Sequence, residues 1–596
     1  WRVLFLCAGG LIFRVGSRKL SDLAGLVHEM PWAVGCMSIG IVSIMGLPPF
    51  NGFVSKYLMI VACMDAGQPL IAAALIAASL VGAIYYMRIL RTILLDPAPA
   101  GRKRVEGVTA TMRWPMIILA ALCVILGVAP QTGLSLITPI LDQLQFGPGV
   151  GGMLPTLPEL DVSWPVYVLL PMFGAIVPIW FRKDRVKAGW GAAAILFLTT
   201  LHVLAFGRDL DMLSYVMALF IPAIGTVNLV YAVGYMEHSH TQWRFYAFFL
   251  LMTGGLLGVA ASSDLFSFFT FWEIMSSWAL YFAIAHEGTP EALREGFKYF
   301  LFNVAGAGFL FLGIGLIVAY TGTGQFAGVA SGFAGLSPAV GTAIVALLAI
   351  GFCMKAAQVS LRIDWQMHPA LAPTPVSGYI SSVLLKIAVF GLVKLFLGFG
   401  SVYAQGASDL FSQATIMYVV AWVGAFTLLY SAVQAMLQNS LKLVFIWSTV
   451  SQIGYMVLGV AVGTSLGMAG GLLHMANHVF FKDLLFLMVG AVMRTHADAI
   501  SELGGVGRRM PVTMFCFFIG SLAAVGVPPT NGFTSKWIIY QALMAEGEPL
   551  LALISLIGSV VTLAYLARFM HTVFLGQPGR DLEHIEEAPW VMRAPM

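Results

Sequence analysis

The sequence predicts an all-α polytopic membrane protein, from its composition, the length of its apolar stretches and the pattern within them. Of its 596 residues, 59% are apolar and 10% are charged, and the mean hydropathy is +0.88. A soluble globular protein carries about 25% charged residues. The apolar stretches reach the roughly 20 residues that a helix needs to cross a bilayer. They are rich in Gly, Ala, Leu and Phe and do not alternate, which argues against a membrane β-barrel.

The chain contains an internal repeat. The run Gly46–Lys56 (Gly-Leu-Pro-Pro-Phe-Asn-Gly-Phe-Val-Ser-Lys) recurs as Gly526–Lys536 (Gly-Val-Pro-Pro-Thr-Asn-Gly-Phe-Thr-Ser-Lys), at an offset of 480 residues (526 − 46 = 480). The same offset, without a gap, pairs further residues: Arg14 with Arg494, Pro31 with Pro511, Cys36 with Cys516, and Tyr85 with Tyr565. Hydropathy alone would not keep Pro, Cys, Tyr and Arg in register, so we expect two homologous modules in tandem.

The repeat register divides the chain into three predicted parts. Residues 1–135 form the C-terminal part of a first module, 136–163 a linker with Gly-Pro-Gly and several prolines, and 164–596 a second module without its last helices. Trp1 falls on Phe481, inside a predicted span, and residues 591–596 stop where the first module opens a span at Met112. We therefore expect the sequence to be a piece of a longer polypeptide.

Predicted spans follow in order along the chain. The first module supplies a partial span before Arg14 and then 31–66, 69–95 and 112–135. The second module supplies 164–182, 188–206, 210–235, 243–261, 264–286, 294–320, 336–360, 374–400, 413–437, 443–463, 466–493, 510–546 and 549–575. Alternation of these spans places the basic clusters on one side, which the positive-inside rule assigns to the cytoplasm: 102–104, 182–187 and 508–509.

Some predicted spans should be broken. The 31–66 and 510–546 stretches are too long for simple helices, and Pro-Pro-x-Asn-Gly interrupts each of them. Proline removes a backbone donor and glycine relaxes the turn, so the helix should break there. The 336–400 region is expected to break at Pro369 and at 372–375. Transporters place ion sites at such breaks, because irregular backbone in a bilayer lines a cavity.

Ionisable side chains lie inside the predicted spans, where such a group costs a few kcal/mol or more and usually marks an ion path. His474, His478 and Lys482 have i, i+4, i+8 spacing and therefore share one helix face. Lys56 and Arg2 are the first-module counterparts of Lys536 and Lys482. The complete candidate set is Glu273, Lys355, Lys386, His474, His478, Lys482, Lys536, Lys56 and Arg2.

This set suits the relay of protons. A buried lysine that gains and loses a carboxylate neighbour alternates between holding and releasing a proton. Histidine titrates near neutrality and can pass a proton between its two ring nitrogens. A chain of lysines and histidines bridged by water would form a half-channel.

Structural roles remain open for each of these residues. Glu273 could belong to a buried pair that fixes packing, Lys355 and Lys386 could reach a membrane interface, and His474 could be a core histidine. Residues near the span ends are expected to be interfacial anchors: Lys298, Lys442 and Arg568. Others lie in the predicted interruption, where loop closure and an ion-path role are equally plausible: Arg362, Asp364 and His368. The six cysteines are scattered singly and lack zinc or iron–sulfur spacing.

Taken in order, the motifs resemble those of the proton-conducting antiporter-like family, which includes the large membrane subunits of respiratory complex I, Mrp-type sodium/proton antiporter subunits and membrane subunits of energy-converting hydrogenases. The resemblance covers 164–596 and, as the tail of a second copy, 1–135. The residues that carry it are Phe271–Ser276 (Phe-Trp-Glu-Ile-Met-Ser), Lys355–Gln358 (Lys-Ala-Ala-Gln), His368–Ser377, Lys386, His474-x3-His478-x3-Lys482 and Gly526–Lys536.

The resemblance implies a role for each of the matching residues. Glu273 and Lys355 would form the central ion pair, Lys386 and the His474–Lys482 helix the connecting relay, and Lys536 the exit-side site. The core would be two inverted five-helix repeats with two broken helices. Arg2 departs from the lysine usual in the family, and arginine releases a proton far less readily. The first module would therefore work differently or use Arg2 as a fixed charge.

The resemblance also implies partners. The His368–Ser377 run is most similar to the hydrogenase and formate-hydrogenlyase branch, and the tandem arrangement resembles the large membrane subunit of the carbon-monoxide-induced hydrogenase. The leading hypothesis is a proton-translocating subunit of a redox complex in a bacterial or archaeal cytoplasmic membrane. Nickel–iron, iron–sulfur or flavin cofactors would belong to partner subunits, and this chain would hold none. An Mrp-like Na⁺/H⁺ antiporter and a non-conducting scaffold are the alternatives, and the lack of an obvious sodium cage favours protons.

Overall fold

The computed structural model describes residues 2–99, 101–102, 105–132, 135, 164–358, 367, 370–398, 413–495, 497–577 and 585–596. Within these ranges the regular structure is helical, and 12 helices are long and apolar enough to cross a membrane, or up to 13 if a bent pair is counted as one span. The predicted all-α fold with many spans is thereby confirmed.

The chain packs as two compact units. One consists of Trp1–Ser163 together with Ser263–Ile274 and Phe311–Gly332, and the other of Trp164–Ser262, Met275–Leu310 and Phe333–Met596. Division by packing thus differs from the predicted division into modules, because two segments of the predicted second module pack in the first unit. The module boundaries at 135 and 164 stay a prediction.

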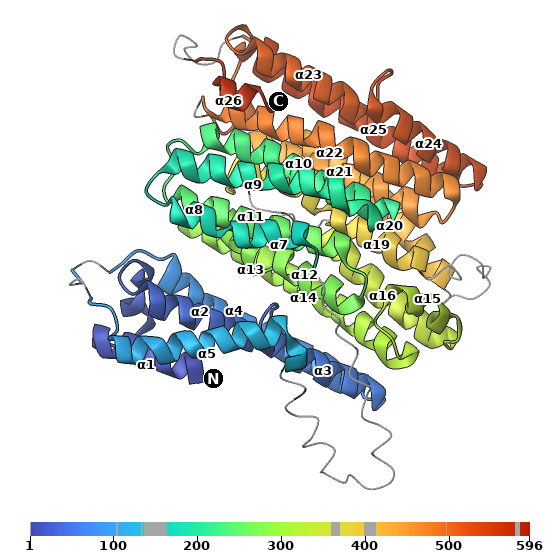
Figure 1. The fold of residues 1–596 in the computed structure, drawn as a ribbon. Helices are drawn as coiled ribbons and strands as arrows, with labels where there is room; N and C mark the ends of the chain where they lie inside the picture. The colour runs from blue at the N-terminus through green and yellow to red at the C-terminus, as the bar shows by residue number, and fades with distance from the viewer. Residues whose placement is uncertain are drawn as a thin grey trace. The chain divides into compact units, whose positions relative to one another are not determined.

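The first unit contains the helices at the start of the chain. They are α1 (Arg2–Val15), α2 (Pro31–Met45), α3 (Asn51–Asp65), α4 (Pro69–Leu94) and α5 (Ala110–Val128), drawn in blue in Figure 1. The first unit also takes in most of α12 (Leu265–Ser276). Phe53 of α3 shows why, since its ring centroid lies 5.3 Å from that of Phe266, 5.8 Å from that of Phe269 and 5.7 Å from that of Phe311. Such aromatic contacts bury a large apolar area.

The second unit holds all or most of each remaining long helix. In chain order they are α7 (Val166–Gly174), α8 (Ile176–Trp180), α9 (Arg185–Phe206), α10 (Met212–Tyr235), α11 (Gln242–Ala261), α13 (Trp278–Ile284), α14 (Pro290–Thr321), α16 (Pro338–Lys355), α18 (Thr374–Tyr379), the π-helical turn Ile380–Leu384, α19 (Lys386–Gly398), α20 (Gln413–Leu437), α21 (Leu441–Ala461), α22 (Ser465–Met493), α23 (Pro511–Val525), α24 (Asn531–Ala545), α25 (Pro549–Phe569) and α26 (Trp590–Arg593). The predicted spans agree with these helices within a few residues, whereas α15 (Phe326–Ala334) was not expected.

The predicted breaks are present. Gly46 ends α2 with φ +78° and Gly526 ends α23 with φ +86°, and each is followed by a cis Pro-Pro bond and a new helix. Helix α16 ends at Lys355 and α18 begins at Thr374, so the 336–400 region is interrupted as well. Pro369 itself lies outside the described residues. The 264–286 span is also divided, at Ser277 between α12 and α13, although no proline marks that position.

Lys386 lies in the most deeply buried helical segment of the second unit, and the other candidate residues of this unit are at most 5% exposed. The most apolar window of Thr374–Leu395 is 100% buried and that of α21 is 94% buried, against 33% for α9. Outward-facing apolar side chains on helices such as α9 are expected where lipid replaces water. The path candidates therefore lie in the interior of the unit, not on its lipid-facing side.

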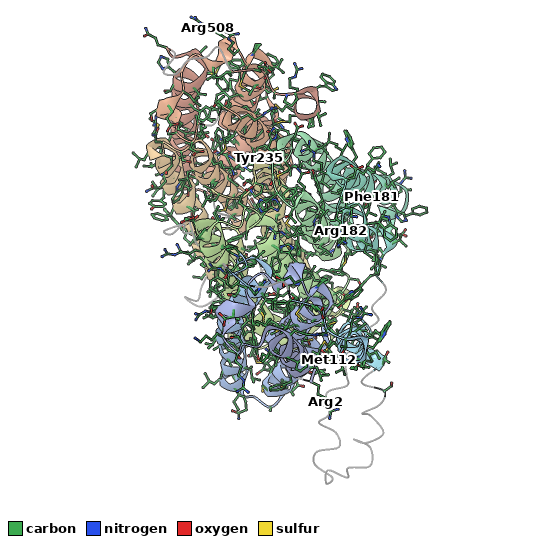
Figure 2. The ribbon with its side chains drawn as sticks, turned by 90° about the vertical axis from the view of Figure 1, so that its left-hand side faces the viewer. Arg2, Met112, Phe181, Arg182, Tyr235 and Arg508 are labelled. Atoms are coloured by element: carbon green, nitrogen blue, oxygen red, sulfur yellow. The ribbon has the colours of Figure 1, made fainter. Side chains whose placement is uncertain are left out.

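Several basic residues lie at one end of the second unit. Figure 2 looks along the helices of this unit onto the end at which Phe181, Arg182, Tyr235 and Arg508 are labelled. Hydrogen bonds connect the loops there: Arg185 donates to Glu237 O, and Thr374 Oγ1 donates to the Tyr235 hydroxyl at 3.1 Å. Arg182 and Arg508 thus share one end, as the charge pattern predicts.

Candidate functional site

Helix α22 carries the longest series of buried ionisable side chains. His474, His478 and Lys482 are each 0% exposed, and their spacing places them along one face of the helix. This face packs against α21 and α24, which supply most of the polar partners described below.

His474 connects α22 to the two neighbouring helices. Its Nδ1 lies 2.9 Å from Ser535 Oγ of α24 and its Nε2 lies 3.2 Å from Gln452 Oε1 of α21. Both ring nitrogens therefore have oxygen partners, and the tautomer decides which of them donates. An imidazole held between two polar groups can accept a proton on one side and release it on the other.

His478 lies one turn further along and is surrounded differently. Its ring centroid lies 6.3 Å from that of His474 and 5.0 Å from that of Phe481. Neither of its ring nitrogens has a hydrogen-bond partner among the described residues. Buried polar atoms without a protein partner are commonly served by ordered water, which is also the medium that carries protons between fixed groups.

Lys482 ends the series in an aromatic pocket with a single hydroxyl partner. Its Nζ donates to Ser448 Oγ at 2.7 Å, and the Tyr565 hydroxyl donates to the same Ser448 oxygen at 2.6 Å. The ammonium also lies 5.8 Å from the ring centroid of Phe445 and 6.0 Å from that of Phe486, within cation–π range. The pocket thus surrounds the lysine mainly with aromatic rings.

Lys386 begins α19, directly after the π-helical turn. Its side chain is 0% exposed, and its Nζ donates to Ser381 O within that turn. π-turns inside helices are frequent at functional sites. The alternative that Lys386 reaches an interface is wrong, because the residue lies in a segment that is completely buried.

Lys355 is the last residue of α16, at the interruption. It is 5% exposed, its Nζ donates to Asn303 Oδ1 at 2.7 Å, and it lies 5.6 Å from the ring centroid of Tyr299. Both of these neighbours come from α14. The alternative that Lys355 reaches an interface is therefore wrong as well.

Glu273 lies on α12 and is 3% exposed. It belongs to the segment that packs in the first unit, whereas Lys355 belongs to the second. The Glu273–Lys355 pair implied by the resemblance stays a prediction.

The repeated runs Gly46–Lys56 and Gly526–Lys536, called the lysine turns below, have matching contacts. Lys536 Nζ donates to Ala524 O at 2.9 Å, Val525 O at 3.1 Å and Ser559 Oγ at 3.1 Å. Lys56 Nζ donates to Met45 O at 2.8 Å and Ser79 Oγ at 2.7 Å, and these partners correspond to Val525 and Ser559 at the 480-residue offset. In each turn the ammonium satisfies carbonyls at the end of the preceding helix.

Lys442 differs from what the sequence suggested. Arg2 begins α1 as the second residue of the sequence, and its role stays a prediction. Lys442 was expected to be an interfacial anchor, but it is 4% exposed and donates to the carbonyl oxygens of Ala370 and Ala372. It therefore fixes the backbone that leads into α18. The other residues of the interruption, Arg362, Asp364 and His368, lie outside the described residues.

Sequence reasoning missed Asp483. This residue follows Lys482 directly, is 3% exposed, and accepts hydrogen bonds from Asn228 Nδ2 of α10 at 2.8 and 3.0 Å and from Ser382 Oγ at 3.1 Å. The same criterion that selected Glu273, a carboxylate inside a predicted span, would have found it. In the described ranges no group of three or more His, Cys, Asp and Glu side chains is arranged to hold a metal ion.

Comparison with known proteins places these residues in a family. The family described as "NADH:quinone oxidoreductase/Mrp antiporter, TM" matches residues 2–82 and 262–562, and the family described as "NADH-Ubiquinone oxidoreductase (complex I), chain 5 N-terminus" matches residues 199–246. The two segments of the first match end 480 residues apart, and 2–82 corresponds to 482–562.

Several individual proteins are similar in sequence to this chain. The chain is 32% identical to NADH-quinone oxidoreductase subunit N of Desulforudis audaxviator, with 63% of this chain and 74% of the relative covered. It is 35% identical to NADH-quinone oxidoreductase subunit L of Mycobacterium tuberculosis (66% and 61% covered) and 28% identical to hydrogenase-4 component B of Escherichia coli (70% and 64% covered). The chain thus spans less than two thirds of the length of the last two relatives.

Solved structures share the fold. A chain of the membrane-bound sulfane sulfur reductase, an archaeal respiratory membrane complex, superposes with a TM-score of 0.66 at 26% identity, with 72% of this chain and 73% of that chain covered. A chain of the Mrp complex from Dietzia sp. gives a TM-score of 0.63 at 21% identity, with 72% and 91% covered. Because the first family matches more than half of the sequence, the chain belongs to the NADH:quinone oxidoreductase/Mrp antiporter transmembrane family.

Proposed function

We propose that this chain is a proton-translocating subunit of a redox-driven membrane complex. The path would consist of Glu273, Lys355, Lys386, the α22 series and Lys536, with Lys56 and Arg2 as its first-module counterparts. The observation that carries the proposal is the α22 series itself. Two histidines and a lysine lie fully buried on one helix face, and His474 contacts Ser535, the residue next to Lys536. A packed apolar core would gain nothing from such a series, since each ionisable group in a bilayer is expensive.

The arrangement gives each residue a step. Lys355 and Lys386 would hold protons in the interior, and a change in the distance between Lys355 and Glu273 would switch the affinity of Lys355 for its proton. Lys482, His478 and His474 would conduct the proton along α22 with the help of water, and Lys536 would deliver it on the far side of the series. Ser448, Tyr565 and Ser535 supply hydroxyl groups that can both accept and donate a hydrogen bond.

The chemistry of these groups favours protons over sodium ions. Lysine offers no acceptor atom, and a protonated histidine offers none either, whereas sodium requires oxygen ligands. The path candidates on α22 are two histidines and a lysine, all of which exchange protons. The translocated ion is therefore proposed to be H⁺.

The redox step would belong to other subunits. The relatives include subunits of NADH-quinone oxidoreductases and a hydrogenase component, so we infer that the chain assembles with further membrane subunits and with a peripheral arm. Nickel–iron, iron–sulfur or flavin groups are proposed for that arm and none for this chain. The complex would lie in a bacterial or archaeal cytoplasmic membrane. The more specific similarity to a carbon-monoxide-induced hydrogenase stays a prediction.

A second candidate is a Na⁺/H⁺ antiporter subunit that needs no redox partner. The observation in its favour is the description of the matched family, which includes Mrp antiporters. Co-purification separates the candidates, since a redox complex should carry iron–sulfur or nickel-containing subunits and an antiporter should not.

Ion flux in proteoliposomes of the purified assembly tests the proposal. Turnover of its redox reaction should acidify one compartment, as reported by a pH-sensitive dye, while a parallel sodium probe stays constant. Lys355→Ala should abolish the acidification, whereas Lys187→Ala, which alters an exposed lysine, should leave it unchanged. If neither ion moves, or if Lys355→Ala pumps as well as the unaltered assembly, the chain is a scaffold and the proposal fails. Movement of sodium would favour the antiporter.

A further inference from the structure

Asp483 stands out because the proposed path does not use it. Among the described residues, Glu273 and Asp483 are the acidic side chains that are buried, each 3% exposed. Glu273 packs in the first unit and Asp483 in the second. An ionised carboxylate inside a bilayer is stable only when donors and a counter-charge compensate it. The position of Asp483 therefore calls for a cation close by.

The donors around Asp483 fit an ionised carboxylate. Asn228 Nδ2 donates to both carboxylate oxygens, at 2.8 and 3.0 Å, and Ser382 Oγ donates to Oδ1 at 3.1 Å. Asn228 and Ser382 are both 0% exposed. Helix α18 comes close at Gly378, where an added Cβ would lie 3.3 Å from Asp483 Oδ1. Hydrogen bonds to the charged form favour that form.

Two lysines, Lys386 and Lys482, are candidates for the counter-charge. Lys386 and Asp483 bind neighbouring residues of the π-helical turn, Ser381 and Ser382, and Lys482 directly precedes Asp483 in α22. Within the described part of the chain, however, Lys386 and Asp483 make no direct ion pair: Lys386 Nζ donates to Ser381 O instead. Ser381 and Ser382 are neighbours in the π-helical turn, so one short segment holds the ammonium and the carboxylate apart.

The internal repeat provides a comparison within the same chain. At the 480-residue offset Lys482 and Asp483 correspond to Arg2 and Val3. Val3 has no charge, and arginine as a residue type releases a proton far less readily than lysine. The first module thus lacks both the lysine and the carboxylate at these positions. In this chain the carboxylate occurs together with the lysine, the residue of the two modules that can gain and lose a proton.

We propose that Asp483 is the counter-charge shared by Lys386 and Lys482, and that it forms a second lysine–carboxylate switch in addition to Glu273–Lys355. When Lys386 is protonated, Asp483 compensates it across the π-helical turn. When the proton has moved on to Lys482, the same carboxylate compensates Lys482, so the cluster carries the same net charge at both steps. The inference rests on the proposed function, because a chain that conducts no protons needs no switch.

The test uses the assembled complex in proteoliposomes and five variants. Asp483→Asn keeps the shape of the side chain and should reduce proton flux about tenfold or more, because a buried partner is left without compensation. Glu546→Gln, the same chemical change at an exposed site directly after α24, should leave flux unchanged. Asp483→Asn combined with Lys386→Met should be no slower than Lys386→Met alone, since Asp483 is proposed to act through this lysine.

Assembly and thermal stability of each variant separate a transport role from a folding role. Asp483→Asn should assemble and melt close to the unaltered complex while its flux is low. If Lys355→Ala stops flux and Asp483→Asn does not, the inference is overturned and the proposed function stands. If the losses from Asp483→Asn and Lys386→Met simply add, Asp483 is a packing residue and not the counter-charge. If Lys355→Ala itself pumps, the proposed function has failed first.

Discussion

Lys482 and Asp483 are neighbours in the sequence but meet opposite environments, because successive residues of an α-helix point about 100° apart. Lys482 faces Ser448 of α21 and Tyr565 of α25, whereas Asp483 faces Asn228 of α10. The hydrogen-bond partners of the two residues therefore come from different helices. The sequence motif directs attention to the lysine, and the importance of the aspartate depends on partners 255 residues away, which no local pattern contains.

Removal of the hydroxyl that holds Lys482 should impair both stability and transport. Ser448→Ala leaves the Lys482 ammonium and the Tyr565 hydroxyl without their common oxygen, and an unsatisfied buried group costs about 1–3 kcal/mol. We expect a lower melting temperature in detergent and a severalfold lower proton flux. Ser331→Ala, at an exposed position of α15, is the matched control. Unchanged flux in Ser448→Ala would remove Ser448 from the path.

His286 should make the protein less stable at mildly acidic pH. Burial, followed by the charges of Arg244 and His240, lowers the pKa of this loop histidine from 6.5 to about 3. Above pH 6.5 the folded and unfolded states are both neutral at this site. As the pH falls below 6.5, His286 becomes protonated in the unfolded state but not in the folded state. Stability is therefore lost progressively down to about pH 3.

Thermal melts in detergent at pH 7.5 and pH 5 measure this effect, at up to about 1.4 kcal/mol per pH unit. The melting temperature should be lower at pH 5, and His286→Gln should reduce the difference. His286 Nε2 lies 3.0 Å from Ser239 Oγ, and glutamine can keep a polar contact there. An equal pH difference in both proteins would show that other groups cause it.

At the scale of elements, the breaks could be predicted where residues impose them and not elsewhere. Pro-Pro-x-Asn-Gly predicted both lysine turns, because proline and glycine act on the backbone locally. The break at Ser277 and the π-helical turn at Ile380–Leu384 carry no such residues, and they depend on how neighbouring helices pack. Helix α15 was missed because its nine residues are too few for a span.

The close approach of α23 and α24 should tolerate no side chain at Gly532. An added Cβ would lie 1.8 Å from Ala523 O, and the equivalent atom on Gly52 would lie 1.8 Å from Ser43 O. Gly532→Ala must therefore push the helices apart and displace Lys536, whose ammonium binds the adjacent Ala524 O. We expect poor assembly or a strongly lowered melting temperature, and loss of flux in whatever assembles.

Gly296→Ala is the control for this substitution. The nearest atom to its added Cβ lies 3.5 Å away, so the helix interior of α14 should gain a little stability from alanine. If Gly532→Ala melts like Gly296→Ala, the close approach of α23 and α24 is not required for the fold.

At the scale of the whole molecule, the charge pattern predicted which helix ends lie together in the second unit. Labelling of single cysteines can test the orientation of the chain in the membrane. The six native cysteines would first be replaced so that they do not react with the label. None of them forms a disulfide, so their replacement removes no cross-link. Arg508→Cys should then react with an impermeant maleimide from the cytoplasmic side, and Glu546→Cys from the opposite side. Reaction of both from the same side would contradict the predicted alternation of α23 to α25.

The recurrence of the lysine turn has a consequence for experiment. Both copies lie in one chain, so every preparation of the protein contains both. They share the glycine, the prolines and a lysine that reaches the serine one helix later. They differ at the start of α1, where arginine and valine stand in place of lysine and aspartate, so a change made in one copy can be compared with the same change in the other.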